Sequence, residues 1–280
     1  MQDKTILITG GNDGIGRAAA RELARRGAEL ILACRSRERG QAAADEIRRQ
    51  TGNERLRVVH CDLASFDSIR EAAGEVATAC ERLDVLINNA GVFTSGLEKT
   101  EEGFEKQFGV NHLGHFLLTR LLLDRLQTAP APRIVNVASL AHLRGDIDFD
   151  NLRGEKGPDR YSAWGAYAQS KLANILFTRA LARRYPGIDS NCLHPGTVAT
   201  HFGNKATNWY SSLFWSLIRP FMISTEKGAR TIVYLAASPE AAGVSGAYFD
   251  EKQQQRNPSE RARDEALAQK LWEVSEGFCG

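Results

Sequence analysis

Short apolar runs alternate along the chain with longer stretches in which apolar residues recur every three or four positions. Such runs are typical of buried strands, and such stretches of amphipathic helices. The predicted strands cover residues 5–9, 29–33, 56–61, 85–87, 133–138, 190–194 and 247–249. The predicted helices cover residues 17–26, 41–50, 65–80, 102–126, 166–184 and 225–237. This alternation indicates an α/β fold with a doubly wound, mainly parallel sheet, and because no linker or repeat interrupts it we expect a single domain over residues 1–280.

Charge and cysteine content exclude several classes of protein. The 36 basic and 34 acidic residues are spread along the chain and leave a net charge of +2, so no basic stripe indicates nucleic-acid binding. The five cysteines are scattered without a C-x-x-C pair, which argues against a disulfide framework or a metal site and favours a reducing compartment. No signal core or spanning helix precedes the first strand, so we expect a soluble, cytoplasmic protein.

Four glycines separate the first predicted strand from the first predicted helix: Gly10, Gly11, Gly14 and Gly16. A tight turn alone would explain glycine here. However, a glycine loop between a strand and a helix also lets backbone N–H groups approach a pyrophosphate, and the helix N-terminus adds its positive dipole end. Although the spacing is G-x-x-x-G-x-G, the position of the loop favours a Rossmann-type dinucleotide site.

Polar residues follow the later strands directly. They are Asp62, residues 88–91 (NNAG), Ser139 and residues 195–196 (PG). Each has an ordinary explanation as a loop aspartate, a turn, a helix cap or a helix breaker. Because parallel strands end at one edge of the sheet, we expect all four to border one crevice, where ligands of such folds bind.

Tyr167 and Lys171 are four residues apart in a predicted helix, so they share one face of it. An ammonium group beside a phenol favours the phenolate, and we expect Lys171 to lower the pKa of Tyr167 so that it works as a general acid or base. The alternative is an exposed, snorkelling pair. Tyr161 lies nearby but has Gly165 where the lysine should be.

Taken together, these segments resemble the motif set of the short-chain dehydrogenase/reductases, in order and almost from end to end. The matching segments are residues 9–16 (TGGNDGIG), 88–91 (NNAG), Asn111, Ser139, Tyr167 with Lys171, and 195–198 (PGTV). Residues 33–36 (ACRS), 171–177 (KLANILF), 141–166 and 271–273 (LWE) are similar to the retinol dehydrogenase-like branch, whose members mostly reduce retinaldehyde or other lipophilic carbonyls. Branch members that work at membranes usually carry an N-terminal hydrophobic anchor, which the sequence does not show.

The resemblance implies a role for each of these residues. Tyr167 would protonate the carbonyl oxygen, Ser139 would orient it, and Lys171 would also hold the nicotinamide ribose. Asn111 would bind a water molecule beside the lysine. The alternative is that it is simply an asparagine with a slightly unfavourable helix propensity. The implied cofactor-binding residues are Gly10, Asn12, Asp13, Gly14, Ile15, Gly16, Arg35, Asp62, Leu63, Asn89, Ala90, Gly91, Tyr167, Lys171, Pro195, Gly196 and Val198.

The end of the second strand bears on the choice of cofactor. A carboxylate commonly holds the free ribose 2′-hydroxyl of NAD(H) there, but here the position is Cys34, followed by Arg35. A guanidinium can bind the 2′-phosphate, with Ser36 and Arg37 close enough in sequence to assist. We therefore expect NADP(H) to be preferred and NAD(H) to be usable; the alternative is that Arg35 is a solvated loop residue.

Residues 209–223 form the least polar irregular stretch and are too short to span a bilayer. We expect a lid over an apolar pocket at about residues 205–224; packing within the domain, a homo-oligomer interface and peripheral membrane contact are the alternatives. The lid and the resemblance predict a lipophilic carbonyl or alcohol substrate. A catalytically silent NADP(H) sensor or scaffold protein remains the alternative function, although such proteins usually lose the serine, tyrosine or lysine.

Overall fold

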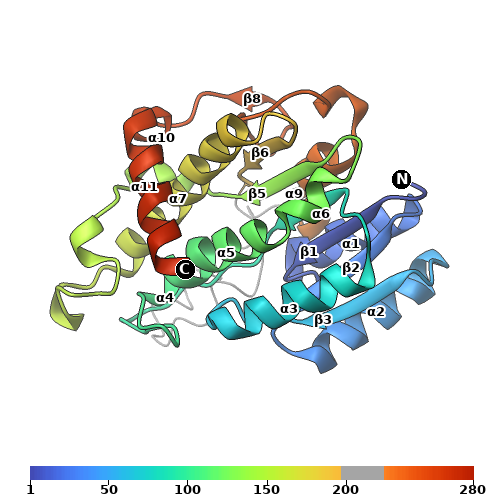
Figure 1. Cartoon of the computed structure of the whole chain (residues 1–280), viewed down its shortest axis with the longest axis horizontal. Helices are drawn as coiled ribbons and strands as arrows, with labels where there is room; N and C mark the ends of the chain where they lie inside the picture. Colours follow the sequence, from blue (N-terminus) through green and yellow to red (C-terminus); the bar gives the residue numbers. More distant parts are fainter. Residues whose placement is uncertain (197–223) are drawn as a thin grey trace.

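A computed structural model describes residues 1–196 and 224–280 of the chain. Eight strands form one sheet in the order β3-β2-β1-β4-β5-β6-β7-β8, parallel except for β8 (Figure 1). The strands are β1 (Thr5–Thr9), β2 (Glu29–Cys34), β3 (Leu56–His60), β4 (Val85–Asn88), β5 (Arg133–Val137), β6 (Asp189–Leu193), β7 (Tyr248–Phe249) and β8 (Gln255–Arg256). The strand order reverses at β1, which pairs with β2 on one side and β4 on the other. A crevice for a ligand is expected at that switch point.

Helices cover both faces of the sheet. They are α1 (Gly14–Arg25), α2 (Arg37–Thr51), α3 (Phe66–Ala79), α4 (Lys106–Phe108), α5 (Gly114–Leu121), α6 (Leu123–Gln127), α7 (Ala163–Arg184), α9 (Thr225–Ala237), α10 (Glu260–Arg263) and α11 (Glu265–Cys279). Because side chains alternate along a strand, Ile6 and Ile8 of β1 join the buried cluster under α1, α2 and α9. Leu7 joins the opposite cluster under α3, α5, α7 and α11. Burial of both faces explains the continuous apolar run of β1.

The predicted fold class is confirmed, and each predicted strand is present with its ends shifted by one residue at most. The helical stretch predicted over residues 102–126 is present but begins at Lys106 and is not one regular helix. Glu105 instead accepts hydrogen bonds from the backbone of Gln107 and Phe108 and starts α4. A π turn, η1 (Gly109–Leu113), then separates α4 from α5. Strand β8 and helix α11 were not predicted; α11 packs against α7 (Figure 1).

Two predictions depend on residues that the structure does not describe. The lid predicted over residues 205–224 lies outside the described residues except for Ser224, which caps the N-terminus of α9. Val198 also lies outside them. Within residues 1–196 and 224–280, no helix combines the length and hydrophobicity needed to cross a bilayer. The same residues contain no group of three or more side chains that could hold a metal ion.

Candidate active site

An open cavity of about 1490 Å³ lies at the carboxyl ends of the parallel strands. The predicted site residues that line it are Gly10, Asn12, Asp13, Gly14, Ile15, Arg35, Asp62, Leu63, Asn89, Ala90, Gly91, Ser139, Tyr167, Lys171, Pro195 and Gly196. Gly16 and Asn111 are buried behind the cavity wall. The structure therefore brings the polar strand ends together in one crevice, as the sequence predicts.

The glycine loop turns tightly from β1 into α1. Gly10 has φ +67°, a conformation that favours glycine. A Cβ atom at Gly16 would lie 2.4 Å from both the Gly10 carbonyl oxygen and Asn89 Nδ2, so only glycine lets the helix approach the strand end so closely. Asp13 Oδ1 accepts a hydrogen bond of 2.8 Å from Gly14 N at the start of α1. This loop and the helix N-terminus fit the pyrophosphate of a dinucleotide.

Beneath this loop, Thr9 hydrogen-bonds the turn that follows β4. Its hydroxyl oxygen accepts hydrogen bonds from Asn89 N at 2.9 Å and Ala90 N at 3.0 Å. Asn89 Nδ2 donates to the Thr9 carbonyl oxygen at 2.8 Å. Thr9 was not predicted as a site residue because it reads as the last residue of a strand. A hydroxyl at the end of an otherwise apolar strand was the available signal.

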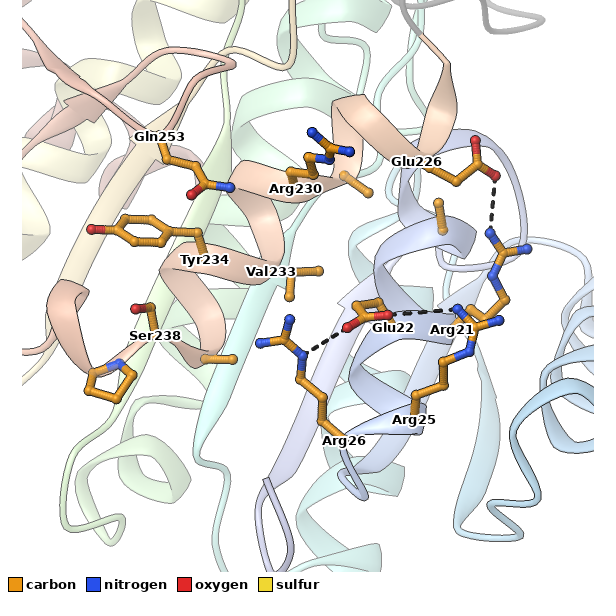
Figure 2. Close-up of a pocket in the computed structure, with 14 residues that line it drawn as sticks. Arg21, Glu22, Arg25, Arg26, Glu226, Arg230, Val233, Tyr234, Ser238 and Gln253 are labelled. Carbon is orange, nitrogen blue, oxygen red and sulfur yellow. Dashed lines mark hydrogen bonds and ion pairs between the residues drawn. The ribbon is translucent and has the colours of Figure 1, made fainter.

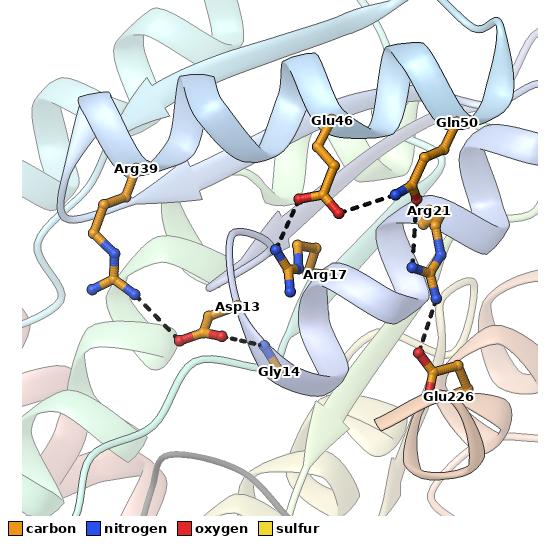
Figure 3. A network of polar contacts seen from close by, with 8 residues as sticks. All are labelled: Asp13, Gly14, Arg17, Arg21, Arg39, Glu46, Gln50 and Glu226. Atoms are coloured by element: carbon orange, nitrogen blue, oxygen red, sulfur yellow. Dashed lines mark hydrogen bonds and ion pairs between the residues drawn. The ribbon is translucent and has the colours of Figure 1, made fainter. Parts of the chain in front are cut away.

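Charged side chains border the end of β2, where Arg39 pairs with Asp13 (Figure 3). Arg35 is exposed and lines the cavity, as expected. Arg39 also lines it and lies 3.2 Å from Asp13 Oδ2, a contact that the sequence analysis missed. Arg37, which was expected to assist, does not line the cavity and pairs with Glu75 at 3.3 Å. Two guanidinium groups, of Arg35 and Arg39, therefore border this end of the cavity.

Ser139, Tyr167 and Lys171 meet where β5 ends against α7. Ser162 caps the N-terminus of α7, and the spacing of four residues places Tyr167 and Lys171 on one face of the helix. The Lys171 Nζ atom lies 5.5 Å from the centre of the Tyr167 ring and donates to the Val137 carbonyl oxygen at 3.1 Å. Ser139 hydrogen-bonds the Tyr167 side chain. The three groups therefore face one part of the cavity.

The protonation of this cluster differs from our expectation. Burial raises the pKa of Tyr167 to about 12, and the hydrogen bond from Ser139 offsets only part of this rise. The predicted lowering of that pKa by Lys171 is therefore wrong for this structure. Burial instead lowers the pKa of Lys171 to about 8. At neutral pH the phenol keeps its proton and Lys171 is mainly cationic.

Asn111 approaches the same region from η1. Its Oδ1 atom accepts from Val92 N at 2.7 Å, and its Nδ2 atom donates to Val92 O at 3.1 Å and Ser170 Oγ at 3.0 Å. A Cβ atom at Gly91 would lie 3.4 Å from Asn111 Oδ1 and 3.6 Å from Lys171 Nζ. Asn111 therefore borders Lys171 without lining the cavity. Helix propensity gave no hint of the π turn, although such turns often occur at functional sites.

The mouth of the cavity is apolar. Leu140, Leu143 and Trp164 line it and are exposed by 48%, 59% and 62% respectively. The Trp164 ring lies 5.0 Å from that of Phe93 and 6.1 Å from that of Tyr167, measured between centroids. Large apolar side chains are seldom left this exposed in a cluster unless they bind something.

A second cleft, of about 530 Å³, lies between α1 and α9 (Figure 2). None of the predicted site residues lines it. Arginines and glutamates on its walls pair with each other; Arg21 lies 3.0 Å from Glu226, and Arg26 lies 3.0 Å from Glu22. These pairs are largely solvated, so each contributes little energy. Ser139, Tyr167 and Lys171 line the larger cavity and not this cleft, so the larger cavity is the candidate active site.

Comparison with known sequences agrees with the motifs. Residues 4–150 match the family described as short chain dehydrogenase. The chain is 46% identical to retinol dehydrogenase 13 of Homo sapiens, with 99% of this chain and 85% of that protein covered. It is 47% identical to retinol dehydrogenase 14 of Homo sapiens, with 100% of this chain and 87% of that protein covered.

Solved structures share the fold. A crystal structure of an uncharacterized protein from Mycobacterium Paratuberculosis is 36% identical with a TM-score of 0.80, covering 99% of this chain and 94% of that one. A short chain dehydrogenase from Shigella flexneri, complexed with NADP, is 26% identical with a TM-score of 0.72, covering 90% of this chain and 98% of that one. The architecture in Figure 1 is thus shared with proteins of quite different sequence.

Proposed function

Because this chain belongs to the short-chain dehydrogenase family and is an oxidoreductase that uses a nicotinamide cofactor, we propose that it is NADP(H)-dependent and acts on lipophilic carbonyls. It would transfer a hydride between nicotinamide and a lipophilic aldehyde or ketone, or the matching alcohol. The observation that carries the proposal is the cluster of Ser139, Tyr167 and Lys171 in a cavity with an apolar mouth.

In this proposal the residues divide the work between binding and proton transfer. The glycine loop and the N-terminus of α1 hold the pyrophosphate, and Lys171 holds the nicotinamide ribose. The bound nicotinamide supplies the hydride. Ser139 donates a hydrogen bond to the carbonyl oxygen and orients it, as an oxyanion-hole donor does. Tyr167 donates its proton to the same oxygen as the carbonyl is reduced.

The protonation of Tyr167 fits the role of proton donor. Its pKa is raised to about 12, so the phenol holds a proton at neutral pH. Reduction needs a proton donor, whereas alcohol oxidation needs an acceptor. We therefore propose Tyr167 as the group that donates the proton in the reduction.

The substrate class rests on the exposed apolar side chains at the mouth and on the relatives, which are named retinol dehydrogenases. We expect retinaldehyde-like and long-chain aldehydes to bind best, with affinity rising by roughly 0.8 kcal/mol for each buried methylene. Purified protein would be tested with NADPH and a series of aldehydes of increasing chain length. Tight NADPH binding without turnover would favour the sensor alternative, and a preference for short, charged substrates would contradict the lipophilic pocket.

Cofactor preference rests on Arg35, which lines the cavity next to Cys34, the position at which a carboxylate would favour NAD(H). Arg35→Ala should raise the Michaelis constant for NADPH about 10-fold, the loss expected for a charged hydrogen bond worth ~1.5 kcal/mol, and leave NADH use nearly unchanged. Arg37→Ala is the matched control, because Arg37 pairs with Glu75 away from the cavity. Equal losses with both cofactors would show that Arg35 does not recognise the 2′-phosphate.

A further inference from the structure

His115 is buried behind the cavity and contacts two segments there, the end of β1 and the π turn. Its Nε2 atom lies 2.9 Å from Thr9 Oγ1, beneath the cofactor loop. Its Nδ1 atom lies 3.0 Å from the carbonyl oxygen of Asn111 in the π turn. All three residues are at most 2% exposed. We propose that His115 is a positioning residue for the reaction, which holds the cofactor-binding turn and the Asn111 turn at a fixed separation; this role rests on the function proposed above.

The hydrogen-bond partners define one tautomer of the ring. A backbone carbonyl can only accept, so the hydrogen of His115 is on Nδ1 and is donated to Asn111. Nε2 then lacks a hydrogen and accepts from the Thr9 hydroxyl. That hydroxyl oxygen already accepts from Asn89 N and Ala90 N, so its own hydrogen is left to donate. The Ile87 carbonyl oxygen, at 3.4 Å, is the more distant acceptor.

The environment keeps this ring neutral. Burial, with a smaller contribution from the nearby charge of Lys171, lowers the pKa of His115 to about 4, although the bond to the Asn111 carbonyl opposes this change. A protonated ring would also present a second donor to Thr9, whose hydroxyl would then have to accept a third hydrogen bond. His115 therefore does not carry protons in the neutral range. Its contribution is the geometry of the groups that it joins.

Those groups lie on two sides of the reaction centre. Thr9 holds Asn89 and Ala90, which line the cavity on the cofactor side. On the other side, Asn111 Oδ1 and Lys171 Nζ both lie within 4 Å of the position that a Cβ atom on Gly91 would occupy. A change in the separation of the two turns would therefore displace the cofactor relative to Lys171. A displacement of this kind can lower a rate strongly without removing any reacting group.

Three substitutions separate the two contacts. In His115→Asn the side-chain amide can take the place of Nδ1 and keep the bond to Asn111 while losing Thr9. In His115→Gln it can reach Thr9 while losing Asn111. His115→Phe loses both contacts but keeps the ring volume. His112 provides the matched control, because it is 1% exposed in the adjoining turn but hydrogen-bonds Ser275 Oγ at 2.9 Å, toward α11.

The measurements are NADPH affinity by fluorescence, and kcat and KM across pH 6 to 9, all for folded protein. Because loss of either contact releases the separation of the two turns, we expect His115→Asn, His115→Gln and His115→Phe each to weaken NADPH binding about 5-fold and to lower kcat about 10-fold. His112→Phe should lower only stability. If His115→Phe fails to fold, the Asn and Gln variants still test the proposal, because each removes one contact and keeps the other.

Wild-type NADPH affinity and kcat in either the Asn or the Gln variant, or a His115→Phe variant that matches His112→Phe in both quantities, would overturn the role of His115. An alkaline or acid limb that appears in the wild type and is lost in His115→Gln would also overturn it, because it would show that the ring titrates during the reaction. NADPH affinity is measured without substrate. The absence of turnover with every carbonyl would therefore refute the proposed function, while the NADPH affinity of the His115 variants relative to His112→Phe still tests His115.

Discussion

Two tyrosines near the start of α7 occupy opposite kinds of site. The Tyr161 hydroxyl lies 2.9 Å from Glu105 Oε1, 2.8 Å from Gln107 Nε2 and 3.0 Å from Thr94 Oγ1. Its hydrogen-bonding capacity is therefore used within the protein, and it does not line the cavity. Tyr167 lines the cavity, with Ser139 and Lys171 beside it.

The difference between the two does not lie in the acidity of the phenols. Burial raises the pKa of Tyr161 to about 12, and that of Tyr167 to the same value. What differs is the neighbouring charge and the access to a ligand. A buried carboxylate, Glu105, accepts the hydrogen of Tyr161, whereas a lysine and an open cavity adjoin Tyr167. Access to the cavity and the charge of the neighbouring groups, more than the pKa of the phenol in the ligand-free protein, therefore distinguish a reactive tyrosine from a structural one.

The sharpest test of this contrast removes each hydroxyl in turn. Tyr167→Phe should lower turnover by about 100-fold or more with NADPH binding retained, because the ring packing stays while the transferable proton is lost. Tyr161→Phe should change turnover less than about threefold. Steady-state kinetics with a responsive aldehyde would measure both. Comparable losses in the two variants would break the distinction.

Lys171 provides the next test. With its pKa lowered to about 8, its side chain is cationic below that pH and neutral above it. The kcat/KM for NADPH, which reports the free enzyme, should therefore fall as the pH rises through about 8. In Lys171→Met this alkaline limb should disappear and kcat/KM should be roughly 10-fold or more lower at pH 7, the loss expected for a charged hydrogen bond. A limb that persists in Lys171→Met would assign it to another group; Tyr161→Phe should keep the limb unchanged.

The smallest expected effect comes from the carboxylate beside Tyr161. In Glu105→Gln an amide NH₂ replaces one of the two carboxylate oxygens. Oε1 accepts from Gln107 N and the Tyr161 hydroxyl, and Oε2 accepts from Phe108 N, so either orientation of the amide loses at least one hydrogen bond. We expect about 1–3 kcal/mol lower stability in urea unfolding, with turnover of the folded protein within about twofold of the wild type. Glu75→Gln, at an exposed ion pair, should cost less than about 1 kcal/mol. A large loss of turnover in Glu105→Gln would indicate that this cluster acts in the reaction.

The parts of the fold that the sequence predicted are those with a strong local pattern. Buried parallel strands such as β1 read as continuous apolar runs, and α9 was predicted with its observed ends. The two-residue strand β8 has both residues exposed, so it lacked any apolar signal. The break at residues 109–113 could not be predicted, since a π turn reflects tertiary contacts of Asn111 and has no characteristic local pattern.

The site residues likewise divide into those with a local sequence pattern and those without one. Glycines, strand ends and the Tyr167 to Lys171 spacing are sequence features, and their convergence in one cavity follows from sheet topology. Residues 4–150, which match the family description, end before Tyr167, so the spacing itself was needed to find the proton donor. Arg39, Thr9 and His115 were missed because each contributes through a partner distant in sequence, Arg39 with Asp13 and His115 with Thr9.

The π turn also sets the helical phase of everything that follows it. In a regular helix each residue advances by about 100°, so the one extra residue taken up by the π turn shifts the residues of α5 by that angle relative to a regular helix of the same sequence. Thr119 then faces Asn88 Nδ2 at 3.0 Å, and His115 faces Thr9. If residues 109–113 formed a regular α-helical turn instead, both side chains would turn away from β1 and β4 at once. The π turn therefore decides which face of α5 meets the sheet.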